Sequence, residues 1–149
     1  MQKIIFFFFF IFFGLLELAH TKDEYFRTLR YEKVNLRQGP AKDYPVKIFY
    51  KKKFLPVLIQ DSSDNYRKIR DHENNSGWIH VSQLTKKKAA IVVDGDLIMF
   101  KNSTIYSNPI VILKEGRLVK IDKCTDNWCK VRSGKFKGWI KKDSLWGLL

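Results

Sequence analysis

The chain has 149 residues, of which 28 are Lys or Arg and 15 are Asp or Glu, so its formal net charge is +13. Such a basic chain is drawn to anionic surfaces such as acidic wall polymers, lipid head groups or an acidic partner. A compositional bias explains the lysines equally well, because Ile, Phe and Asn are abundant too. The two Cys and three His have no finger-like spacing, which excludes a zinc site.

The first element predicted along the chain is an apolar N-terminal segment. After Lys3, residues 4–16 are almost entirely Phe, Ile and Leu, with only Gly14 interrupting. A basic start and a short apolar run are typical of an export signal, and the run is shorter than the roughly 20 residues that a spanning helix needs. We predict a signal peptide at residues 1–20, or an uncleaved anchor, because residues 17–20 form no clear cleavage site.

The rest of the chain is internally repeated. The segment DNYRKIR at 64–70 nearly matches DNWCKVR at 126–132, and each is followed by Gly-Trp-Ile, at 77–79 and 138–140. Each unit then ends near a leucine, Leu84 or Leu145. A fixed period of this kind indicates a duplicated module. Most of the Gly, aromatic and turn residues therefore belong to a repeated scaffold, which lowers the prospect that any of them is catalytic.

Short apolar stretches alternate with turn signals throughout both units, and almost no segment has helical periodicity. Several short strands at this spacing indicate a small β-barrel or sandwich. Residues 91–93 are predicted to begin the second unit or to tie the two units together. The other predicted strands are residues 46–50, 55–59, 66–70 and 78–81 in the first unit, and 110–113, 118–121, 128–132 and 139–141 in the second.

The two cysteines flank a predicted hairpin turn at Asp126-Asn127. In such a turn Thr125 faces Trp128, and Cys124 faces Cys129. The Cα atoms of a non-hydrogen-bonded pair lie about 4.5 Å apart, which is within the disulfide range. We therefore predict a disulfide between Cys124 and Cys129. The first unit has Ser62 and Arg67 at the matching positions, so the module does not require the bridge.

Several motifs resemble a known family. V-N-L-R-Q-G-P at 34–40, Y-P-V at 44–46 and G-W-I at 77–79 resemble the bacterial SH3-like domain. C-T-D-N-W-C-K-V at 124–131, G-W-I at 138–140 and L-W-G at 145–147 are similar to the tandem SH3-like family of proteobacterial envelope proteins. The resemblance implies an all-β chain with two small barrels, at 25–86 and 90–147, that serve in binding. The second unit departs from the motif at residues 100–102, so we do not expect identical ligand grooves.

Aromatic residues are the candidate ligand-binding positions. Tyr44 and Tyr50 lie near the first loop, where SH3-like folds bind peptides. Lysines 51–53 beside them suit a peptide that carries carboxylates. Trp78 and its counterpart Trp139 either pack the barrel or face a groove, because a buried indole N–H needs a partner.

Tyr106 is the remaining candidate for ligand binding in the second unit, whereas Tyr66 and Trp128 are expected to pack the two cores. Neither His72, expected to be a solvated loop residue, nor His80 lies near a nucleophile motif, so we expect no catalytic residue, no metal and no cofactor.

The sequence therefore predicts an exported, periplasmic and non-catalytic binding module. Its expected ligand is a cell-wall peptide or an acidic envelope protein. Nucleic acid is not expected for an exported chain, and membrane contact is expected only through an uncleaved signal. The alternative is a structural or regulatory protein–protein interaction domain that binds no small ligand.

Overall fold

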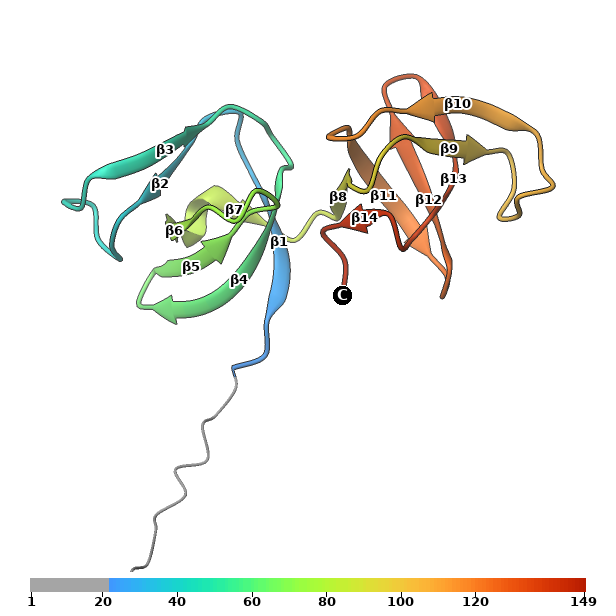
Figure 1. Cartoon of the computed structure of the whole chain (residues 1–149). Helices are drawn as coiled ribbons and strands as arrows, with labels where there is room; N and C mark the ends of the chain where they lie inside the picture. The colour runs from blue at the N-terminus through green and yellow to red at the C-terminus, as the bar shows by residue number, and fades with distance from the viewer. Residues whose placement is uncertain (1–21) are drawn as a thin grey trace, which may run out of the picture.

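The structure is a computed structural model that describes residues 22–149 (Figure 1). The predicted signal at residues 1–20 lies outside this range. The described residues form two antiparallel sheets, one in each unit, and a single turn of 3-10 helix, η1 (Val81–Gln83). The all-β prediction is confirmed. Within residues 22–149, no helix has the length and apolar character needed to span a membrane.

The first unit is a seven-stranded sheet with the spatial order β3-β2-β6-β5-β4-β1-β7. Its central meander, β4 to β6, pairs in sequence order, and β1 lies between β4 and the short β7. The strands are β1 (Tyr25–Leu29), β2 (Val34–Arg37), β3 (Val46–Tyr50), β4 (Pro56–Ser63), β5 (Tyr66–Arg70), β6 (Ser76–His80) and β7 (Leu84–Thr85).

The second unit repeats this topology, with the order β10-β9-β13-β12-β11-β8-β14. Trp78 pairs with Arg37 between β6 and β2, and Trp139 pairs with Phe100 between β13 and β9. The equivalence of the two tryptophans is thus confirmed. The strands are β8 (Ala89–Val92), β9 (Leu97–Phe100), β10 (Pro109–Leu113), β11 (Leu118–Cys124), β12 (Trp128–Ser133), β13 (Phe136–Lys141) and β14 (Leu145–Trp146).

The predicted strands correspond closely to the central meanders, and β3 and β5 have the predicted bounds. Strands β1, β2, β7, β9 and β14 were not predicted. Strands β7 and β14 have only two residues each, and β9 is apolar throughout, so none of the three gives an alternating pattern. Strand β2 does alternate, but it is only four residues long. Such short strands are held by pairing to the rest of the sheet, which a local pattern does not reveal.

Each unit has its own core, built from alternate residues of the strands. Ile79 and Ile140 are completely buried, whereas the tryptophans that precede them are half-buried on the outer faces. Tyr66 and Trp128 also lie half-buried outside the cores, so the expectation that they pack the interior is wrong. The buried residues of the first core are Leu29, Val34, Leu36, Tyr50, Leu55, Val57, Ile59, Ile69, Ile79, Leu84 and Ile91, and those of the second are Ala90, Val92, Met99, Leu113, Val119, Cys129, Val131, Ile140 and Leu145.

A glycine precedes each tryptophan where two strands approach closely. A Cβ atom on Gly77 would lie 2.6 Å from the carbonyl oxygen of Arg37, and one on Gly138 would lie 2.6 Å from that of Phe100. No side chain fits at these distances, so each position requires glycine. The contact joins the β2–β3 hairpin to the β4–β6 meander, and the same holds in the second unit.

The two units pack against each other across the short linker that follows β7 (Figure 1). Phe26 of β1 and Trp146 of β14 meet edge to face, with ring centroids 4.8 Å apart. The hydroxyl of Thr28 donates a hydrogen bond to the carbonyl of Lys87 at 2.7 Å. Ile91 of β8 is buried in the first unit's core. His72, which was expected to be solvated, is half-buried with its ring 6.1 Å from that of Trp146.

The close approach at the glycines predicts a large effect of a single methyl group. Gly77→Ala should lower the free energy of unfolding by about 1–3 kcal/mol, because the added Cβ is forced against a backbone oxygen that a side-chain rotation does not move. Urea denaturation measures the change. Ser76→Ala, one residue earlier on β6, is the control and should change stability by less than about 0.5 kcal/mol. Equal stabilities of the two variants would contradict the close packing.

Candidate binding site

A groove of about 690 Å³ lies at one end of the second unit. Three segments form its walls: the loop after β9, the turn between β11 and β12, and the chain that leaves β13. Loops carried by a rigid sheet are common places for binding sites. The lining residues are Ser103, Thr104, Ile105, Asp126, Asn127, Trp128, Lys141, Lys142, Asp143 and Leu145.

Trp128 is the aromatic side chain of this groove. It faces outward because its strand neighbour Cys129 fills the core, and successive residues of a strand point to opposite faces. Its ring meets that of Phe100 in a T-shaped arrangement, with centroids 5.8 Å apart and an interplanar angle of 81°. Edge-to-face packing of this kind is favourable. The pair therefore presents a fixed, half-exposed aromatic surface to a ligand.

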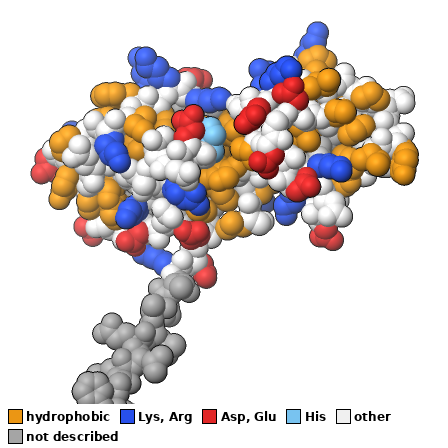
Figure 2. All heavy atoms as spheres, in the orientation of Figure 1, with side chains coloured by type: hydrophobic (Ala, Val, Ile, Leu, Met, Phe, Trp, Pro, Cys, Tyr) orange, Lys and Arg blue, Asp and Glu red, His pale blue; other side chains and the backbone are white. Residues whose placement is uncertain are grey.

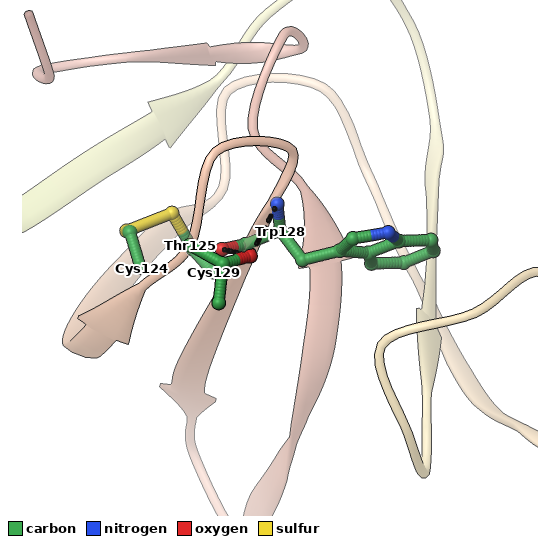
Figure 3. Close-up of a disulfide and its surroundings, with 4 residues drawn as sticks. All are labelled: Cys124, Thr125, Trp128 and Cys129. Carbon is green, nitrogen blue, oxygen red and sulfur yellow. Dashed lines mark hydrogen bonds between the residues drawn. A yellow bond between two sulfur atoms is a disulfide. The ribbon is translucent and has the colours of Figure 1, made fainter.

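A disulfide and a compact turn hold Trp128 in place (Figure 3). Cys124 and Cys129 are bridged, which confirms the predicted pairing. Within the turn, the N–H of Thr125 donates to the carbonyl of Trp128 at 2.7 Å, and the N–H of Trp128 donates to the hydroxyl of Thr125 at 3.3 Å. The N–H of Lys142 donates to the carbonyl of Asn127 at 2.9 Å and ties the turn to the opposite wall.

The charges around the groove are of both signs. Asp126 and Asp143 supply carboxylates, and Lys141 and Lys142 supply ammonium groups. None of these four side chains forms an ion pair within the described part of the chain. They remain available to a ligand that carries both an amino group and a carboxylate.

Tyr50, predicted to bind ligand, is instead a core residue. Its side chain is buried, and its hydroxyl donates a hydrogen bond to the Asp71 carboxylate at 2.8 Å. Burial raises the pKa of the Tyr50 phenol far above its usual value, and the hydrogen bond to Asp71 raises it further. A ligand does not reach this ring, so Tyr50 is no longer a candidate ligand-binding residue.

The other predicted residues lie on the surface but are not gathered at one site. Tyr44 is 46% exposed and packs over Gly39, where a Cβ would come within 2.5 Å of the ring. Tyr106 is 90% exposed and directly follows the loop residues that line the groove. Trp139 lies beside Phe100 on the outer face, with the ammonium groups of Lys123 and Lys130 5.6 and 5.9 Å from its ring centroid. Trp78 has the same place in the first unit.

Sequence reasoning missed Trp128 as a groove residue and Phe100 as the ring that packs against it. The alternation of the strand was the available signal, because Trp128 lies on the opposite face from the apolar Val131. In the first unit, Arg37 replaces Phe100, and its guanidinium donates to the carbonyl of Tyr44 at 2.9 Å. The aromatic pair thus belongs to the second unit, in line with the expectation that the two grooves differ.

Among residues 22–149, no cluster of three or more His, Cys, Asp or Glu side chains could hold a metal ion.

Comparison with family models matches the bacterial SH3 domain at residues 30–86 and 98–147, which together make up more than half of the chain. The chain belongs to this family. One matched segment falls in each of the two repeated units, so the resemblance drawn from the motifs is confirmed. A search of curated proteins found no match.

Two solved structures resemble the chain in outline. NlpC2 from Trichomonas vaginalis is 14% identical, with a TM-score of 0.38, over 83% of this chain and 48% of that one. NlpC1 from the same organism is 12% identical, with a TM-score of 0.37, over 85% of this chain and 47% of that one. The bacterial SH3 chain therefore spans about half the length of either structure.

The disulfide is expected to stabilise the second unit modestly. Closing so short a loop contributes about 2 kcal/mol through the entropy of the unfolded chain, so reduction should lower the free energy of unfolding by no more than this. Denaturation with and without reductant measures the difference. Cys124→Ser removes the exposed partner only and should abolish the sensitivity to reductant. An undiminished response in that variant would contradict the assignment.

Proposed function

We propose that this bacterial SH3 chain is a non-catalytic binding module that takes a short envelope peptide into the groove of its second unit. The observation that carries the proposal is Trp128 in the wall of the groove, packed on Phe100 and held by the disulfide-closed turn. A peptide of the cell wall, which bears both amino and carboxylate groups, matches the mixed charges at the rim. Tyr106, next to the groove loop, is placed to extend the contact.

Export to the periplasm is part of this proposal. The bridge between Cys124 and Cys129 supports it, because structural disulfides persist in oxidising compartments. The apolar segment at residues 4–16 supports it as well. In this location the basic surface attracts anionic polymers in general, and the aromatic groove supplies the selectivity.

The alternative, an interaction domain with a protein partner and no small ligand, is favoured by a different surface. On the hairpin of β9 and β10, Ile98 and Ile112 lie opposite each other and are 42% and 59% exposed. Figure 2 shows hydrophobic side chains gathered over this end of the second unit. An exposed apolar patch on an edge strand suits contact with another protein chain.

A binding titration with a synthetic peptidoglycan stem peptide tests the proposal. Trp128→Ala should weaken binding by about 30-fold, which corresponds to about 2 kcal/mol for a central aromatic contact. The matched control is Tyr66→Ala, which removes the ring at the equivalent position of the first unit and should leave the affinity unchanged.

Both variants must first show a folded far-ultraviolet spectrum and a cooperative transition. Equal loss of affinity in the two variants would contradict the groove. If the wild-type chain retains neither the peptide nor intact peptidoglycan at any salt concentration, the interaction-domain alternative replaces the proposal.

A further inference from the structure

Three grooves outside the groove around Trp128 adjoin one another along the junction of the two units, and we call them together the track. The groove around Phe54 shares Lys87 and Lys88 with a second groove beside Phe26. The second groove shares Arg27 and Lys86 with a third, beside Tyr25. The track therefore runs from the second unit, over the linker, to the outer side of the first unit.

The side chains that line this track are strongly basic. None of the lining residues is Asp or Glu. Arg132, at one end, is ion-paired with Asp122, but none of the other cations has an ion-pair partner among the described residues. The cations are Arg27, Arg30, Arg67, Lys86, Lys87, Lys88, Lys120 and Arg132.

The density of charge is greatest around Phe54. The ammonium groups of Lys53, Lys87 and Lys120 lie 5.3, 5.6 and 4.9 Å from the centroid of its ring. These lysines come from the first unit, the linker and the second unit. Phe54 itself has a φ of +64°, in the left-handed region that a bulky residue rarely adopts. The fold thus holds the backbone of Phe54 in a strained conformation and its ring among three like charges, and an anion would relieve the repulsion between these charges.

Each aromatic ring of the track already has a partner within the protein. Phe54 is surrounded by the lysines, Phe26 packs edge to face on Trp146, and the guanidinium of Arg27 lies 4.4 Å from the ring centroid of Tyr25. Proteins that bind single-stranded nucleic acid without sequence preference stack bases on exposed aromatic rings. Here the rings support the cations, so charge alone would make the contact.

We propose that this track binds an anionic polysaccharide, a linear polymer with a carboxylate or similar charge on successive sugars. The cations are spread along three adjoining grooves, as an extended polymer with regularly spaced charges would require. The disulfide argues for an oxidising compartment, where polysaccharide rather than nucleic acid is the polyanion at hand. This site is separate from the peptide groove and does not depend on it.

The test uses polygalacturonate oligomers as the probe and neutral dextran as the uncharged comparison. Replacing Lys87, Lys88 and Lys120 together by Gln should weaken binding at least about tenfold at low salt and flatten the salt dependence, because fewer counterions are released. Replacing Lys33, Lys42 and Lys101 by Gln removes the same charge from exposed sites outside the track and should have a much smaller effect. The Trp128→Ala variant should bind the polymer like the wild type.

Each other outcome overturns the proposal. If both triple variants lose affinity equally, the polymer is attracted by the net charge of the protein and not by a defined track. If the wild type does not bind polygalacturonate in low salt, or binds dextran equally well, the ligand class is wrong. If single-stranded oligothymidylate binds more tightly at equal charge and loses affinity with the track variant alone, the track is a nucleic-acid site.

Discussion

Each unit depends on one place where two backbones touch without a side chain between them. At Gly77 and Gly138 the meander comes so close to the preceding hairpin that a methyl group would collide with a carbonyl oxygen. That contact joins the two parts of each sheet and sets the register of the strand. The register turns the following tryptophan outward and the next isoleucine inward. In the second unit it also brings Phe100 to the position from which it packs on Trp128.

Much of this fold could be predicted from the repeat, because motifs that recur at a fixed period predict the same structure for both units. The disulfide could be predicted from the turn between its cysteines. The orientation of the aromatic rings could not, since G-W-I places a large and a medium apolar residue side by side and either could fill the core. Tyr50 was misassigned for a related reason: its neighbouring lysines are exposed, but the ring turns inward to reach Asp71, which is distant in sequence.

The two units share the same arrangement of strands but differ in the side chains that it carries. Asp71 is buried in the first unit and accepts hydrogen bonds from Tyr50, from two backbone N–H groups and from the Asn75 side chain. Ser133 has the equivalent place two residues beyond the core valine of β12, and it accepts a hydrogen bond from Arg117. Buried polar groups need partners, so each copy provides its own. Divergence of this kind leaves the second unit with an aromatic groove and a disulfide that the first unit lacks.

The packing of Phe26 on Trp146 keeps the two units in contact, so their binding surfaces do not move independently. A wall polymer that bore both anionic sugars and peptide branches would engage both proposed sites at once. When one part of such a polymer is bound, the local concentration of the other at its own surface is set by the short span between them rather than by the bulk solution. Two weak contacts joined in this way hold a ligand far longer than either alone. The joint between the units would thereby determine the avidity of the two proposed sites together.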